Sequence, residues 1–189
     1  MENKPTQKFF TDVTELRKRA REHILKGAVT PDYEGDVKTA VKILNEALAT
    51  ELVCVLRYRS HHFMAEGIHA KAVAQEFMEH AHEEQDHADW IAARIRQLGG
   101  RPEFNPSGLL SKSHSEYQEG ETLTEMVKED LIAERVAIES YKEMIHYFAE
   151  KDPTTRRLLE KILEVEEEHA EDMSSILSTL NPAGRPKTD

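Results

Sequence analysis

Two Glu-x-x-His motifs, 82 residues apart, constrain the fold of this chain more than any other feature. The first runs from Glu84 to His87 and the second from Glu166 to His169. Residues three apart lie on one face of an α-helix, so each motif directs a carboxylate and an imidazole to the same point. An unpaired carboxylate inside a protein costs several kcal/mol, which approaches the stability of a whole domain. Because both motifs interrupt the apolar stripe of a predicted helix, we expect positive charge to lie between the two helices. The stripe residues are Val73, Phe77, Ala81, Ile91, Ile95 and Leu98 in the first helix and Leu159, Ile162, Val165, Met173, Ile176 and Leu180 in the second.

The composition favours a protein that attracts cations. Among 189 residues, 36 Asp and Glu outnumber 25 Lys and Arg, and the formal net charge is -11 at pH 7. This acidic balance argues against tight nucleic-acid binding. The single cysteine, Cys54, excludes an intrachain disulfide framework and a Cys-x-x-Cys metal site. No apolar run has the roughly 18 residues of a membrane span and no signal peptide follows Met1, so we expect a cytoplasmic protein without membrane contact.

Few Gly and Pro residues and many helix-forming residues predict an all-α chain. We expect a tail and a short N-terminal helix in residues 1–35, a bundle of helices in residues 36–181 and a flexible tail in residues 182–189. The short helix should begin at Asp12 and end at Gly27. The bundle helices should span about 36–67, 69–98, 122–149 and 152–181.

The connections predict how the four bundle helices are joined. The breaks near Gly67 and Asp152 are short, which makes two antiparallel hairpins. The middle connection, residues 101–120, is rich in Pro, Ser and Gly, and about twenty residues can span roughly 65 Å at ~3.3 Å each. A helix of about 30 residues is only about 45 Å long, so this connection can return along the whole bundle. Two hairpins joined by one long crossover form the ferritin-like antiparallel four-helix bundle.

An internal repeat links all four helices. Residues 48–58 have the pattern Leu-x-x-Glu-x-x-x-Val-x-x-Tyr, and residues 131–141 repeat it with Ile in place of Val. Each hairpin therefore supplies one glutamate in an apolar stripe, a tyrosine two turns later and a Glu-x-x-His motif. This is the ligand set of di-iron and di-manganese bundles, because hard oxygen donors with one imidazole per metal suit divalent Fe or Mn. The predicted metal ligands are Glu51, Glu84, His87, Glu134, Glu166 and His169.

The sequence also resembles the bacterioferritins and their Dps-like relatives over roughly residues 40–180. The segments that carry the resemblance are LNEALATELVCVLRY, EEQDHADWIAARIRQLGG and EVEEEHAEDM. The resemblance implies a ferroxidase centre with two Fe ions per subunit, or Mn as an alternative, held by the six predicted ligands, with Tyr58 beside the metal pair. It further implies that O2 or hydrogen peroxide oxidises Fe(II), and that a homo-oligomeric cage stores the Fe(III) as a mineral.

The chain departs from the bacterioferritin pattern in two places. Bacterioferritins carry a haem-ligating methionine immediately after the second-helix glutamate, where this chain has Gln85. An amide does not replace a thioether as an axial ligand, so haem is not expected. A short tail with Pro182 and Pro186 stands where 24-subunit ferritins have a fifth helix, and a leading helix resembles that of the 12-subunit Dps-like cages. We therefore expect twelve subunits, with 24 as the alternative. The leading helix should pack on a neighbouring subunit through Val13, Leu16, Ala20, Ile24 and Leu25.

Two other functions stay open on the sequence. A manganese catalase uses a similar ligand set, so the ligands alone do not exclude it. A peroxidase of the rubrerythrin type is excluded, because its rubredoxin iron needs four cysteines. The other function is DNA coating of the Dps type, with contacts from the basic residues Arg17, Lys18, Arg19 and Arg21. Because the chain is acidic overall, we expect these basic residues to be solvated at the surface and not to bind DNA.

Residues near the motifs have simpler interpretations as well. Tyr58 and Tyr141 fit core aromatics with satisfied hydroxyls at least as well as redox groups. Cys54 fits a small core residue. His80, one turn before Glu84, is expected beside the ligands or in the core. The histidines expected at the surface are His61, His62, His69, His82, His114 and His146. The acidic residues expected on a solvated face or an acidic inner wall are Glu79, Glu83, Glu167 and Glu168.

Overall fold

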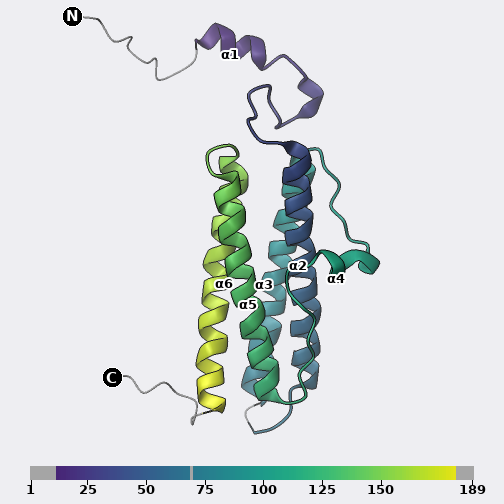
Figure 1. Ribbon diagram of the computed structural model, residues 1–189, viewed down its shortest axis with the longest axis vertical. Coiled ribbons are helices and arrows are strands. Elements are labelled where there is room, and N and C mark those ends of the chain that lie inside the picture. The colour runs from purple at the N-terminus through teal and green to yellow at the C-terminus, as the bar shows by residue number, and fades with distance from the viewer. Residues whose placement is uncertain (1–11, 69, 182–189) are drawn as a thin grey trace, which may run out of the picture.

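The computed structural model describes residues 12–68 and 70–181, and it is built around four long helices that lie side by side (Figure 1). No strand occurs among these residues, so the predicted all-α, ferritin-like four-helix bundle is confirmed. None of the helices in the described ranges is long and apolar enough to cross a membrane. The bundle helices are α2 (Val37–Met64), α3 (Ala70–Gln97), α5 (Leu123–Phe148) and α6 (Pro153–Leu180). The short elements are α1 (Val13–Arg19), η1 (Ile24–Lys26), η2 (Pro106–Gly108) and α4 (Leu109–Lys112).

Side-chain caps begin three of the bundle helices, α2, α5 and α6, at the residues where the sequence predicts these helices to start. The Asp36 carboxylate accepts hydrogen bonds from the first backbone N–H groups of α2. Thr122 and Glu125 form a capping box at the start of α5. Asp152 directly precedes Pro153, the first residue of α6. Its carboxylate accepts a hydrogen bond from the backbone N–H of Thr155 at 2.9 Å. These caps satisfy N–H groups that have no partner inside the helix, which places each helix start.

The segment before the bundle differs from the prediction. The helix α1 ends at Arg19 instead of Gly27, and His23 then adopts a left-handed conformation with φ of 52°. A residue in that conformation cannot continue a right-handed helix. None of the residues in α1 is buried, so no packing stabilises a longer helix. Residues 1–11 and 182–189, which include most of the predicted tails, lie outside the described residues.

The crossover between the hairpins runs along α2. The Asn45 side chain donates to the carbonyl of Arg101 at 3.2 Å and accepts from the N–H of Glu103 at 2.9 Å. Further along α2, the Thr50 hydroxyl accepts from the N–H of His114 at 3.0 Å. Between these points, η2 and α4 are helical turns where the sequence predicted only loop, and Leu109 of α4 packs in a small cluster with α2.

A buried polar network anchors the end of the crossover. Arg57 donates from Nε to Asp130 at 2.8 Å and from Nη1 to the carbonyl of Glu116 at 2.9 Å. His61 lies 2.8 Å from the other Asp130 oxygen, and its second ring nitrogen is 3.1 Å from the carbonyl of Gln118. The prediction that His61 is a surface residue is wrong, because the crossover and Asp130 of α5 bury it completely.

Two apolar clusters fill the bundle on either side of its middle. One contains Leu44 and Leu48 of α2 with Ile91 and Ile95 of α3. The other contains Phe77 of α3 and residues such as Val127 and Met173 from the second hairpin. The polar motifs lie between these clusters along the helices, so apolar side chains flank them on both sides along the bundle axis.

Candidate metal centre

The middle of the bundle gathers acidic and imidazole side chains from all four long helices. Each of the six residues is at most 1% exposed to solvent. They are Glu51 of α2, Glu84 and His87 of α3, Glu134 of α5, and Glu166 and His169 of α6. The apolar stripes explain why these residues are buried, because each of them lies on the core-facing side of its helix.

These side chains form two groups that overlap. The first joins Glu51, Glu84, His87 and Glu166, and the second joins Glu84, Glu134, Glu166 and His169. Within each group, one nitrogen or oxygen of every residue lies within 4.8 Å of the others. Glu84 and Glu166 belong to both groups, whereas each histidine and each remaining glutamate belongs to one. The arrangement therefore offers two adjacent positions that share two carboxylates.

The two imidazoles face the carboxylates through their Nδ1 atoms. His87 Nδ1 is 3.0 Å from Glu166, 3.3 Å from Glu51 and 3.5 Å from Glu84. His169 Nδ1 is 3.6 Å from Glu84, and 3.9 Å from both Glu134 and Glu166. Both histidines thus point the same ring atom into the shared space, one from each end of it.

Seven nitrogen and oxygen atoms of these six residues are buried without a hydrogen-bond partner. Leaving one buried polar atom unsatisfied costs about 1–3 kcal/mol, so this cluster would be highly destabilising if nothing else bound to it. Carboxylate oxygens with one imidazole nitrogen at each position are donors that suit divalent Fe or Mn. The donor set and the orphaned atoms therefore fit two divalent metal ions.

The buried carboxylates and imidazoles shift one another's pKa values. Burial, together with the neighbouring charge on Glu84, raises the pKa of Glu51 from 4.5 to about 8. Burial and the charges on Glu84, Glu51 and Glu134 raise the pKa of Glu166 well above its usual value. Although burial opposes it, contact with the carboxylates raises the pKa of His87 to about 10. All three shifts favour the protonated forms, which shows that the cluster of carboxylates attracts positive charge.

Two tyrosines connect the hairpins at this centre. The Tyr58 hydroxyl of α2 donates a hydrogen bond to Glu134 of α5, and the Tyr141 hydroxyl of α5 donates to Glu51 of α2. Each tyrosine therefore orients the glutamate of the other hairpin. Burial, reinforced by the nearby carboxylates, raises the pKa of both phenols well above its usual value, so both remain protonated donors. The sequence predicted satisfied hydroxyls here but did not identify their partners.

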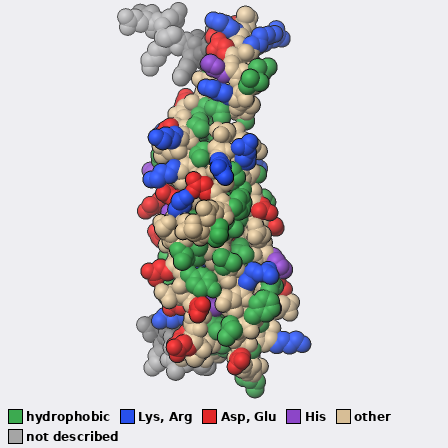
Figure 2. All heavy atoms as spheres, turned by 90° about the vertical axis from the view of Figure 1, so that its right-hand side faces the viewer, with side chains coloured by type: hydrophobic (Ala, Val, Ile, Leu, Met, Phe, Trp, Pro, Cys, Tyr) green, Lys and Arg blue, Asp and Glu red, His purple; other side chains and the backbone are tan. Residues whose placement is uncertain are grey.

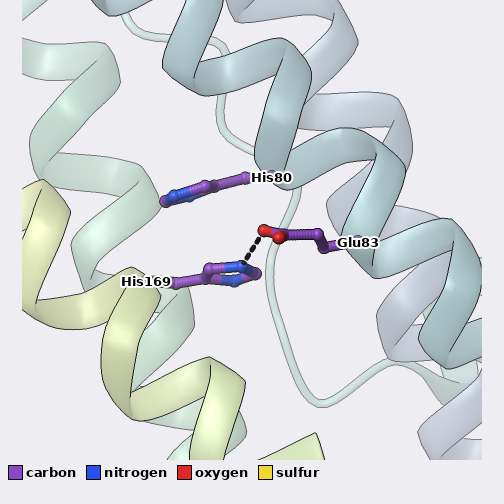
Figure 3. A group of neighbouring side chains, drawn as sticks. All are labelled: His80, Glu83 and His169. Atoms are coloured by element: carbon purple, nitrogen blue, oxygen red, sulfur yellow. Dashed lines mark hydrogen bonds and ion pairs between the residues drawn. The ribbon is translucent and has the colours of Figure 1, made fainter.

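The surroundings of His169 differ from those of His87. Its Nε2–H donates to Glu83 at 2.8 Å, and the ring stacks on His80 with centroids 3.9 Å apart (Figure 3). The Glu83 side chain is 53% exposed, so this side of the centre is close to solvent. A carboxylate that holds one ring nitrogen of a histidine leaves the other nitrogen free to bind metal. The sequence analysis grouped Glu83 with acidic residues of a solvated face or inner wall. Its position directly before Glu84 was the available sign that it lies close to the metal ligands.

Cys54 and Gln85, which the sequence analysis also considered, lie outside the two ligand groups. Cys54 is buried, and its sulfur accepts a hydrogen bond from Arg57 at 3.6 Å. Burial raises the pKa of the Cys54 thiol well above its usual value. Gln85 lies on the outer side of α3 and donates to Asp89 at 3.1 Å. His69 lies outside the described residues.

Comparison with known proteins places the chain in a family. The model of the ferritin-like domain family matches residues 41–183. The chain belongs to this family. It is 32% identical to the bacterioferritin of Mycobacterium leprae over 145 residues, which cover 76% of this chain and 87% of that protein.

Solved structures of ferritin-like proteins have the same fold. The bacterioferritin-related protein of Bacteroides fragilis, described as a dodecameric thioferritin, is 32% identical with a TM-score of 0.76. The alignment covers 79% of this chain and 90% of that one. The bacterioferritin of Desulfovibrio desulfuricans, whose di-iron site has been seen in different catalytic states, is 26% identical with a TM-score of 0.69. That alignment covers 78% of this chain and 83% of the bacterioferritin.

Proposed function

We propose that this ferritin-like chain is a ferroxidase that oxidises Fe(II) at a di-iron centre within each subunit and stores the Fe(III) in a cytoplasmic cage. The observation that carries the proposal is the pair of ligand groups that share Glu84 and Glu166. Glu84 and Glu166, which belong to both groups, would be shared by the two ions. Glu51 and His87 would hold one ion, and Glu134 and His169 would hold the other. The bacterioferritin relatives support iron as the metal, with Mn as the alternative.

Two Fe(II) substrate ions would supply two electrons which, with two protons from solvent, reduce O2 to hydrogen peroxide, or one hydrogen peroxide to two water molecules. The protein contributes a buried site in which the shared carboxylates would hold both ions close together. Tyr58 and Tyr141 orient Glu134 and Glu51 by donating hydrogen bonds to them. The partly exposed Glu83, bonded to His169, gives Fe(II) an acidic approach from the face between α3 and α6.

Exposed hydrophobic residues support assembly into a cage. Figure 2 shows hydrophobic side chains spread along the face that carries α2 and α4. Phe63 at the end of α2 is 71% exposed and Leu110 of α4 is 65% exposed. On the N-terminal segment, Val13 is 58% exposed and Leu25 is fully exposed. Exposed apolar side chains that gather on one face mark an interaction surface, and neighbouring subunits of a cage would cover this one.

We propose twelve subunits, as in the dodecameric relative from Bacteroides fragilis. Native mass spectrometry should then give about 260 kDa for twelve copies of the 21.7 kDa chain. A mass of about 520 kDa would instead show 24 subunits. A dimer that assembles no further would argue against storage.

Substitution of the ligands tests the oxidation site. We expect Glu84→Ala and His169→Ala to abolish rapid Fe(II) oxidation in stopped-flow measurements and to leave a helical, assembled protein. The matched control is Glu168→Ala, which removes an exposed carboxylate next to His169 and should oxidise Fe(II) at the parent rate. A ligand variant that keeps the parent rate would refute the assignment. Rapid release of O2 from hydrogen peroxide without net iron uptake would instead identify a manganese-catalase type of activity.

A further inference from the structure

A second cluster of metal-binding side chains lies beside the di-iron centre. Glu76 and His80 of α3 and Asp172 of α6 each place one donor atom within 4.8 Å of the others. His80 Nε2 is 3.6 Å from Glu76 Oε1 and 3.7 Å from Asp172 Oδ2. These separations are too long for hydrogen bonds. They are close to the distance of about 3.4 Å between two ligands bound tetrahedrally to one ion at about 2.1 Å.

The hydrogen bond between His80 and Tyr58 assigns the proton of a neutral His80 ring to Nδ1 and leaves Nε2 as an acceptor. The Tyr58 hydroxyl donates its hydrogen bond to Glu134. The oxygen of Tyr58 is then the acceptor for His80 Nδ1, which is 3.2 Å away. A neutral imidazole carries only one N–H, so the Nε2 lone pair points toward the two carboxylates. Three groups that can only accept thus face one another, and a cation satisfies all of them.

The internal repeat shows that this cluster is specific to one side of the centre. In the repeat of α3 and α6, equivalent positions are 82 residues apart. The positions equivalent to the three donors are Leu158, Ile162 and Trp90, all of them apolar. The repeat-related position in the bundle is therefore occupied by apolar side chains. A buried histidine between two carboxylates occurs only at the other position, on the α3–α6 face that includes Glu83.

Among the described residues, no lysine or arginine pairs with the negative charge of this cluster. Within residues 12–68 and 70–181, neither Glu76 nor Asp172 has a lysine or arginine nitrogen within 4.0 Å. Burial, and then the charges on Asp172, Glu79 and Glu83, raise the pKa of Glu76. The His80 side chain is 3% exposed, whereas those of Glu76 and Asp172 are 34% and 45% exposed. The imidazole is therefore held inside the protein, whereas the two carboxylates are accessible to ions from solvent.

We propose that Glu76, His80 and Asp172 form a third metal site, which binds one divalent first-row cation such as Fe(II) beside the di-iron centre. One imidazole and two carboxylates supply its ligands, and water completes the coordination. The hydrogen bond from His80 to Tyr58, and from Tyr58 to Glu134, connects this site to the ligands of the metal pair. The proposal concerns binding alone and does not depend on ferroxidase activity.

Equilibrium binding of Co(II) to the full-length protein tests the third site. We expect three Co(II) ions per parent chain, and two per chain in Asp172→Asn and Glu76→Gln, with the third bound at least about tenfold more weakly. The matched control, Glu171→Gln, removes the exposed carboxylate next to Asp172 and should still bind three. If both variants bind three ions with parent affinity, the proposal is wrong.

Anomalous diffraction from crystals grown with Co(II) separates this site from the metal pair. We expect a distinct peak between Glu76, His80 and Asp172 in the parent, and none there in Asp172→Asn. A parent crystal without that peak overturns the third site, whatever density lies between Glu84 and Glu166. Conversely, a peak at the third site alone would support this inference and contradict the di-iron centre.

Discussion

Replacing Glu51 with glutamine should stabilise the metal-free protein at neutral pH. The carboxyl group of Glu51 is fully buried, and its pKa rises from 4.5 in the unfolded chain to about 8 in the folded protein. Above pH 4.5 the folded state therefore retains a proton that the unfolded chain releases, so stability falls as pH rises, until the folded pKa is reached. The loss is about 1.4 kcal/mol per pH unit, or about 3 kcal/mol between pH 4.5 and pH 7.

The glutamine side chain resembles the protonated form of Glu51. Its carbonyl oxygen can still accept the hydrogen bond that Tyr141 donates to Glu51. Part of the gain is lost because the amide NH2 group of glutamine replaces the Glu51 oxygen that lies 3.3 Å from His87 Nδ1. We therefore expect Glu51→Gln to gain about 2 kcal/mol at pH 7, which corresponds to roughly 4–8 °C in Tm for a chain of this size.

Thermal unfolding followed by circular dichroism in the presence of a chelator measures this effect. The Tm difference between Glu51→Gln and the parent should be large at pH 7 and nearly absent at pH 5. Adding Co(II) should raise the Tm of the parent more than that of the variant, which has lost a ligand. The control Glu139→Gln, an exposed site on α5, should change stability by less than about 0.5 kcal/mol. A variant that melts below the parent at pH 7, or a difference independent of pH, would refute the reasoning.

Two other outcomes test different parts of the structure. Asp130→Ala should lower the free energy of unfolding by about 3–5 kcal/mol in urea titrations, because it leaves Arg57 and His61 buried without their carboxylate. A loss below about 1 kcal/mol would show that this network does not hold the crossover. Protein produced with added haem should show no Soret band, because Gln85 stands at the position of the haem-ligating methionine. A stoichiometric haem spectrum would contradict this.

The four bundle helices were predictable because each has an apolar stripe, and α2, α5 and α6 also have a side-chain cap. Asp36, Thr122 and Asp152 are strong N-caps in the sequence, and all three cap the helices in the structure. The length of α1 was overestimated, because a longer helix would need packing contacts and none of the residues of α1 is buried. The turns of η2 and α4 contain too few residues to show a helical period, so the sequence did not reveal them.

At the centre, the sequence predicted which residues meet but not how they pair. The repeat placed Tyr58 and Tyr141 near the glutamates, but bonding across the two hairpins depends on how they dock. Arg57, His61 and Asp130 were missed because the route of the crossover decides their burial. One signal was available, since Asp130 lies one turn before Glu134 and therefore on the same core-facing side of α5.

The amount of Fe(II) oxidised in the first rapid phase is the most direct test of the di-iron centre. Fe(II) is mixed in increasing ratios with metal-free protein in oxygenated buffer, and the amplitude of the fast phase is followed by stopped-flow absorbance. We expect this amplitude to saturate at two Fe(II) per chain and to disappear in Glu84→Ala. Saturation at one Fe(II) per chain, or an equal fast phase in Glu84→Ala, would contradict a centre built on two shared carboxylates.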